Sequence, residues 1–230
     1  MFMGHYAPAI WLGRDEKNGA PIKLWQAFLA VQMIDIVFFV LVGFGFEGTL
    51  ISNGDPIFNI PWSHSLFSSL LLSGLAGLGF KLWKKLSGWR AFWVVSGLVF
   101  SHWILDFIVH RPDLPLFPGA DEVYGLGVWN FPWLAYFLEV GLLFFGFVYW
   151  VSHTKPLQLQ YRIAPWVLFV LMGGIQFMIV TMPGLQVQNG TFDPTSQPQG
   201  VFLSVSGLMT FFALAGTIGW IEAGRVLKTD

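Results

Sequence analysis

Residues 101–111 read Ser101-His102-Trp103-Ile104-Leu105-Asp106-Phe107-Ile108-Val109-His110-Arg111, and this stretch places two histidines and a carboxylate at four-residue spacing inside an apolar segment. Each step of four residues along an α-helix turns by only about 40°, so His102, Asp106 and His110 share one helical face. The surrounding apolar segment is long enough to cross a bilayer. Ionisable side chains within a membrane span are rare and usually face a bundle interior or a wet cavity, so the stripe predicts a functional site.

The composition of the whole chain is that of an integral membrane protein. Of its 230 residues, 55% are hydrophobic and only 11% are charged, whereas soluble domains average roughly 25% charged residues. The formal net charge of −1 excludes a strongly basic nucleic-acid binder, and the lipid bilayer is the partner that this composition predicts. The absence of cysteine leaves His, Asp and Glu as the strong metal ligands.

Six apolar segments approach the roughly 20 residues that a spanning helix needs. They cover residues 24–46, 62–80, 89–110, 129–151, 163–182 and 201–223. The separators carry turn residues and leave no room for a separate soluble domain. We therefore expect an all-α, polytopic membrane bundle that forms one domain over residues 1–230, with an interfacial or re-entrant segment (1–23), helices 1–4 (24–151) and helices 5–6 (152–230).

Basic residues are divided unevenly between the two sides of such a bundle. When alternate loops are assigned to opposite sides, Arg111 alone falls on one side, and the other side holds Arg14, Lys17, Lys23, Lys81, Lys84, Lys85, Arg90, Lys155, Arg162, Arg225 and Lys228. The positive-inside rule then predicts cytoplasmic termini and an exterior Arg111 loop. Within the second span, the small residues Ser69, Ser73 and Gly77 predict close packing against a neighbouring helix.

Four ionisable side chains converge at one depth in this topology. At a rise of 1.5 Å per residue, Asp35, His64, His102 and Asp106 lie about 17–25 Å above the cytoplasmic ends of their helices, with His110 just above them. Histidines and aspartates form a common ligand set for zinc and also suit manganese or iron. A metal bound there would lower the pKa of a bound water towards about 7 and make hydroxide available for hydrolysis.

The spacing leaves other interpretations open. His102 could hydrogen-bond Asp106, and Asp35 could pair with His64, which would tie the helices together without metal. Chains of Asp, Glu and His also mark ion and proton paths, although six helices without inverted repeats or paired broken helices do not favour a transporter. The competing non-enzymatic interpretation is an accessory or scaffolding subunit of a larger membrane complex, because large apolar faces suit partner helices as well as lipid.

Three further ionisable residues are weaker candidates for a role in the site. Glu139 lies within the fourth apolar segment and is a candidate ligand or general base. Asp113 follows Pro112 in a loop, where we expect a solvated charge. His153 stands beside Lys155 at the cytoplasmic end of the fourth segment, where a solvated helix terminus is expected.

Several short motifs occur over roughly residues 1–145. They are Gly4-His5-Tyr6-Ala7, Gln32-Met33-Ile34-Asp35, Trp62-Ser63-His64-Ser65, Ser101-His102-Trp103-Ile104-Leu105-Asp106, Val109-His110-Arg111-Pro112-Asp113-Leu114-Pro115-Leu116 and Gly125-Leu126-Gly127-Val128-Trp129-Asn130, together with Glu139. As a set, these motifs resemble bacterial integral membrane proteins and, more distantly, the inner-membrane family described as metal-dependent hydrolases. The segments after residue 152 carry none of these motifs.

The resemblance implies one metal site in a protein of the bacterial inner (cytoplasmic) membrane. Its implied members are His5, Asp35, His64, His102 and Asp106, with His110 beside them. We expect a hydrolase that uses a divalent metal, zinc before manganese or iron, on a lipid-borne or membrane-accessible ester or phosphoester. Glu139 or His110 would then handle the proton.

His5 conflicts with the topology that the basic residues predict. Positive-inside counting leaves the N-terminal segment in the cytoplasm, whereas the other candidate ligands lie in the outer half of the membrane. Either residues 1–13 re-enter the bundle, which is allowed when their backbone is buried against protein, or His5 is not a ligand.

Overall fold

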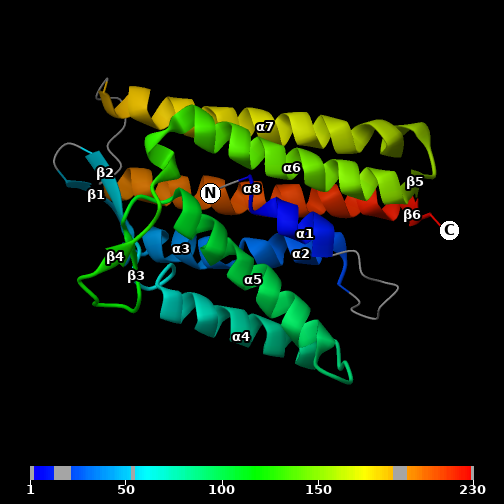
Figure 1. The fold of residues 1–230 in the computed structure, drawn as a ribbon, viewed down its shortest axis with the longest axis horizontal. Helices are drawn as coiled ribbons and strands as arrows, with labels where there is room; N and C mark the ends of the chain where they lie inside the picture. The colour runs from blue at the N-terminus through cyan, green and yellow to red at the C-terminus, as the bar shows by residue number, and fades with distance from the viewer. Residues whose placement is uncertain (1–2, 13–21, 53–54, 189–195, 229–230) are drawn as a thin grey trace.

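The computed structural model describes residues 3–12, 22–52, 55–188 and 196–228. These residues form a bundle of helices with short strand pairs at its two ends (Figure 1). The α-helices are α1 (Tyr6–Leu12), α2 (Leu24–Val31), α3 (Met33–Gly43), α4 (Leu66–Trp83), α5 (Arg90–Val109), α6 (Pro132–His153), α7 (Leu159–Gln188) and α8 (Gln197–Ala223). The strands are β1 (Gly48–Ser52), β2 (Asp55–Asn59), β3 (Leu114–Pro115), β4 (Val123–Tyr124), β5 (Thr154–Pro156) and β6 (Arg225–Leu227), and a 3₁₀ turn, η2, covers Val128–Asn130.

The helices are those of a multi-pass membrane protein. Within the described residues, α4, α5, α6, α7 and α8 are each long and apolar enough to span a membrane, and α2 with α3 makes a sixth span if the pair counts as one. The boundaries differ from the expected ones by a few residues, because α7 begins before residue 163 and η2 precedes α6. The sequence therefore predicted the architecture, but not where each helix starts.

The first apolar segment is broken, and the expectation of one continuous helix over residues 24–46 is wrong. α2 and α3 meet at an angle of 53° around Gln32. The break places Asp35 in the first turn of α3 and leaves the carbonyl of Val31 to accept a bond from another helix. Broken helices at membrane depth occur where their freed backbone groups are buried against protein.

The two ends of the bundle differ in structure and in charge. β1 to β4 lie together at one end, whereas β5, β6 and the turn between α4 and α5 lie at the other (Figure 1). Arg111 follows α5 at the first end. Among the described basic residues, the second end holds those that border α2, α4, α5, α6, α7 and α8, namely Lys23, Lys81, Lys84, Lys85, Arg90, Lys155, Arg162, Arg225 and Lys228. The fold thus separates the basic residues as the loop count predicted.

The N-terminal helix α1 is packed inside the bundle. It contacts α2, α5 and α6, and Tyr6, Ala9 and Ile10 are fully buried. Backbone N–H groups ahead of α1 are held by side chains of two later helices, since Met3 N donates to Gln176 Oε1 (3.2 Å) and Gly4 N donates to Glu139 Oε2 (3.4 Å). Of the two expectations for this segment, the buried one describes its position.

Close helix packing occurs where small residues predicted it. α4 and α5 lie side by side, and Ser69, Ser73 and Gly77 are all buried on α4. A Cβ atom on Gly77 would fall 2.7 Å from the carbonyl oxygen of Phe92 on α5. This approach fixes α5, the helix that carries His102 and Asp106, against α4.

Candidate metal centre

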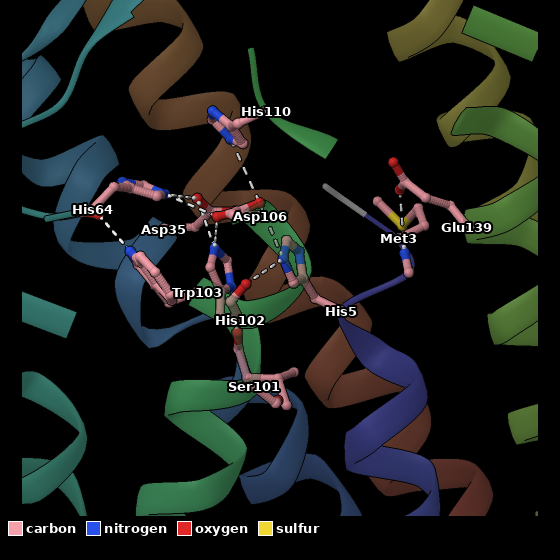
Figure 2. Close-up of polar contacts among 12 residues, drawn as sticks. Met3, His5, Asp35, His64, Ser101, His102, Trp103, Asp106, His110 and Glu139 are labelled. Carbon is pink, nitrogen blue, oxygen red and sulfur yellow. Dashed lines mark hydrogen bonds and ion pairs between the residues drawn. The ribbon is translucent and has the colours of Figure 1, made fainter. Parts of the chain in front are cut away.

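Four side chains from three parts of the chain meet inside the bundle (Figure 2). Asp35 comes from the start of α3, His64 from the turn before α4, and His102 and Asp106 from successive turns of α5. Each of the four is at most 6% exposed. We call these four residues the His/Asp tetrad.

The tetrad has the dimensions of a tetrahedral metal site. His102 Nε2 lies 3.1 Å from Asp106 Oδ2 and 3.4 Å from Asp35 Oδ1, and His64 Nε2 lies 3.3 Å from Asp35 Oδ1 and 3.5 Å from Asp106 Oδ2. Donor atoms about 2.1 Å from a tetrahedral ion lie about 3.4 Å from one another. The four observed separations therefore match four of the six edges of such a site.

His102 is held in the orientation that a metal ligand would need. Its Nδ1–H donates to the carbonyl oxygen of Val31 (2.6 Å), which is an acceptor only. In a neutral ring Nε2 then carries a lone pair, and this lone pair faces the carboxylates of Asp35 and Asp106. Nε2 makes no hydrogen bond within the described residues. Two carboxylate oxygens facing a lone pair repel it, unless a cation or a proton lies between them.

A two-residue relay orients His64 in the same way. Ser63 Oγ donates to Glu47 Oε2 (2.6 Å), so the serine oxygen must accept the Nδ1–H of His64 (2.7 Å). Glu47 is itself fixed by the backbone N–H groups of Trp62 (2.7 Å) and Ser63 (2.9 Å), which donate to its Oε1. Histidines that bind metals nearly always donate their second ring N–H to such a partner. The Nε2 lone pair of His64 is therefore directed at the tetrad.

His110 lies above the tetrad and completes the stripe on α5. Its Nδ1–H donates to Asp113 Oδ1 (2.8 Å), and its Nε2 lies 3.5 Å from Asp106 Oδ1. Burial opposes protonation of the ring, but the carboxylates of Asp106 and Asp113 outweigh it and raise the pKa of His110. Asp113 is buried, so the expectation of a solvated loop charge is wrong.

Aromatic rings cover His110 at the end of the bundle that holds β1 to β4. The ring of Trp129 lies 4.2 Å from that of His110, and Phe58 lies 5.7 Å from it. The loop that carries Trp129 approaches so closely that a Cβ on Gly125 would lie 2.5 Å from the carbonyl oxygen of His110. His110 therefore stands between the tetrad and this cover.

His5 reaches the centre from the N-terminal segment. Its ring stacks on that of His102 at 3.7 Å, and its Nε2 lies 3.3 Å from Asp106 Oδ1 and 3.3 Å from the carbonyl oxygen of His102. One nitrogen of His5 also lies within 4.8 Å of donor atoms of Asp35 and His102. Burial lowers the pKa of His5 to about 3, so the ring is neutral at pH 7. The conflict between His5 and the topology is thus resolved by the position of α1.

Glu139 lies apart from the tetrad. It is fully buried, and Figure 2 shows it beside Met3, separated from the histidines by the N-terminal segment. Its Oε2 accepts the backbone N–H of Gly4. Glu139 therefore supports the segment that carries His5. His153 is exposed, bonds to the carbonyl of Tyr149, and lies where the sequence predicted.

The buried His/Asp groups could hold a metal ion. Two overlapping sets qualify within the described residues, His64 with His102 and Asp106, and His5 with Asp35 and His102. No family model, curated protein or solved structure matches the chain. The chemistry of the centre is therefore argued from its own residues.

Proposed function

We propose that this protein is a membrane-embedded, metal-dependent hydrolase that cleaves a lipid-borne or membrane-accessible ester or phosphoester. The observation that carries the proposal is the common orientation of His64, His102 and His110. Each donates Nδ1–H to a fixed acceptor and directs Nε2 at Asp35 or Asp106. A ligand set needs this arrangement, because the bond at Nδ1 fixes the ring and leaves Nε2 to face the ion.

In the proposed site, His64, His102 and Asp106 would hold the ion, and Asp35 would lie beside them. Two imidazoles and a carboxylate are a ligand set typical of catalytic zinc and acceptable to manganese or iron. A water would take the remaining position, and the metal would activate it at neutral pH. The hydrogen bonds from Glu47 through Ser63 hold the ring of His64 in its orientation, and the carbonyl of Val31 does the same for His102. His5 packs against the tetrad and restrains Asp106 through its second oxygen.

His110 is the residue we propose for proton transfer. Its Nε2 lies near Asp106 Oδ1, at the edge of the tetrad, and Asp113 accepts a hydrogen bond from Nδ1 on the other side of the ring. A histidine backed by a carboxylate is the common arrangement for accepting and returning a proton. Glu139, bonded to Gly4, is proposed to position the N-terminal segment, and the proton path does not include it.

The membrane setting supports a lipid-borne substrate. The tetrad is buried among spanning helices, and the described loops are too short to form a separate soluble domain. A substrate that partitions into the bilayer would reach this depth without crossing an aqueous phase. The resemblance to inner-membrane metal-dependent hydrolases agrees with the proposal as an analogy, and on that analogy we propose a bacterial inner-membrane location.

Hydrolysis by paired variants tests the proposal. The purified protein would be assayed in mixed micelles on fluorogenic phospholipid and acyl-ester substrates, before and after chelation and with zinc, manganese or iron restored. We expect turnover that chelation abolishes and metal restores, a loss of at least about a hundredfold in His64→Gln, and wild-type turnover in His153→Gln.

The opposite outcome favours the accessory-subunit interpretation. Metal-independent turnover, or equal turnover in His64→Gln and wild type, would refute a metal-dependent hydrolase. A protein without metal that copurifies with other chains in fixed ratio, measured by native mass spectrometry in mild detergent, would instead indicate a scaffolding role.

A further inference from the structure

A second polar feature lies at the end of the bundle opposite Trp129. It is a pocket of about 370 Å³, which falls within the roughly 300–1,000 Å³ typical of small-ligand sites. Its lining residues come from the end of α6, from β5 and β6 with the residue after them, and from the first turns of α7. These elements meet at one end of the bundle (Figure 1). Its lining consists of Val151, Thr154, Lys155, Pro156, Arg162, Trp166, Arg225 and Lys228.

The charge of this pocket is entirely positive within the part of the chain that the structure describes. Four of its lining residues are basic, and none is acidic. Cations gathered without carboxylates repel one another, so the arrangement favours an anion between them. Arg162 also lies in the first turn of α7, where the helix dipole adds partial positive charge.

Two of the four cations build the pocket, and two are available to a ligand. Arg225 is buried and donates to Thr154 Oγ1 (2.8 Å) and to the carbonyl of Tyr161 (2.5 Å), while Lys228 donates to the carbonyl of Ser152 (2.5 Å). These bonds fix the strand pair as a rigid floor. Lys155 and Arg162 are exposed and present their charges at the rim.

The remaining walls are apolar. Val151 and Pro156 line the pocket, and Trp166 is half-buried in it. Tryptophan beside basic residues at the end of a spanning helix is typical of headgroup depth in a bilayer. The pocket therefore offers an apolar wall towards the membrane core and a cationic rim towards the water, which is the polarity of a phospholipid at the boundary between headgroup and acyl chain.

We propose that this pocket binds the phosphate headgroup of an anionic phospholipid. Lys155 and Arg162 contact the phosphate, and Val151 and Trp166 pack against the glycerol and the first methylenes. Basic pockets between spanning helices on the positive side of a membrane are suited to such headgroups. The site is separate from the His/Asp tetrad and does not depend on the proposed hydrolysis.

Lipid binding by charge-matched variants tests the site. Short-chain phosphatidylglycerol, phosphatidylcholine or glycerol 3-phosphate would be titrated into the purified protein in neutral detergent. Binding would be followed by native mass spectrometry and by the thermal unfolding midpoint. The test variant carries Lys155→Gln with Arg162→Gln, and the matched control carries Lys84→Gln with Lys85→Gln, which removes the same charge from the same end of the bundle.

We expect one tightly held phosphatidylglycerol per wild-type chain and no such binding of phosphatidylcholine. Each basic residue near an anionic headgroup contributes about fivefold to affinity, so the test variant should bind about thirtyfold more weakly. The control should bind within about twofold of wild type. A Lys155→Arg and Arg162→Lys variant should keep binding, which separates loss of charge from loss of fold.

Three results would overturn the proposal. Unchanged phosphatidylglycerol binding in the test variant would show that the pocket is not the site. An equal loss in the Lys84 and Lys85 control would show that general surface charge holds the lipid. Equally tight binding of glycerol 3-phosphate would show that the pocket takes a free phosphate ester and not a membrane lipid.

Discussion

Replacing Asp106 with asparagine should weaken metal binding about a hundredfold while leaving the bundle folded. Asp106 is the one residue that contacts His5, His64, His102 and His110, at 3.3, 3.5, 3.1 and 3.5 Å respectively. Asparagine has nearly the same shape as aspartate, so the substitution creates no cavity, but it carries no negative charge. If the centre binds metal, the variant loses a charged ligand. If the centre is only a set of paired side chains, the amide can still hydrogen-bond the imidazoles.

The expected loss can be worked from the ligand count. Structural zinc sites with four ligands bind with about 10–16 kcal/mol, so one ligand accounts for about 3 kcal/mol. That energy corresponds to a fall of about a hundredfold in metal affinity. Because metal binds the folded state only, the wild-type protein should also lose several degrees of unfolding midpoint on chelation, and the stabilisation lost by Asp106→Asn should be about 3 kcal/mol smaller.

Elemental analysis and thermal unfolding in mild detergent measure both effects. Asp121→Asn is the matched control, since Asp121 is exposed in a loop and should behave as wild type. The reasoning is refuted if wild-type protein retains no metal and its unfolding midpoint ignores the chelator while Asp106→Asn still unfolds at a lower temperature. That pattern would identify the centre as ion-paired side chains that stabilise the bundle directly.

Three further substitutions test how the fold supports the centre. Ser63→Ala removes the acceptor that orients His64 and should weaken metal binding about 10- to 100-fold, as measured by competition with a chromophoric chelator. It should also lower the metal-free free energy of unfolding by about 1–3 kcal/mol, because Glu47 and His64 lose a buried partner. Gly77→Ala forces a methyl group against the backbone of α5 and should lower the free energy of unfolding by about 1–3 kcal/mol. Gly79→Ala is its control, because a Cβ there meets nothing within 4 Å, and it should leave the free energy of unfolding unchanged or slightly higher. Equal effects of the two substitutions would contradict the packing argument. Arg225→Gln removes charged hydrogen bonds to β5 and α7 and should cost roughly 3 kcal/mol, read from denaturation in detergent; a midpoint equal to wild type would show that those bonds contribute nothing.

The sequence alone predicts those parts of the fold that depend on length and polarity. A run of apolar residues long enough to span a bilayer can be recognised from the sequence, however the helices are arranged in the fold. The unequal division of basic residues between the loops indicates that successive helices alternate in direction. The break at Gln32 is different, because neither proline nor glycine stands at that position. The bend is set by the bond from His102 to Val31 and by packing against α8, which only the folded bundle supplies.

The candidate centre shows the same division. His102 and Asp106 share a helix, so a four-residue spacing predicts that they are neighbours. Asp35 and His64 are predicted to join them only because their depths in the membrane match, since their helices run between the same two membrane surfaces. Depth cannot say which faces meet, and that depends on contacts such as the one between Gly77 and α5.

The residues that orient the histidines were missed for a related reason. Glu47 and Asp113 belong to loops, where the sequence pattern gives no direction for a side chain. Each had a weak signal, however: an acidic residue directly follows the first apolar segment in one case, and a proline fixes the backbone before the other. A carboxylate next to a membrane histidine is therefore a better candidate for a histidine partner than for a solvated charge.

The anchoring of the N-terminal segment has a consequence for how the protein is made. The segment with His5 is made before its partners, since its backbone is held by Glu139 on α6 and Gln176 on α7, and α2 begins with a bond from Leu24 N to Glu222 at the end of α8. These partners follow the residues that they hold by 135, 173 and 198 positions. The N-terminal segment, and with it His5, therefore cannot be held in place until those later helices have joined the bundle.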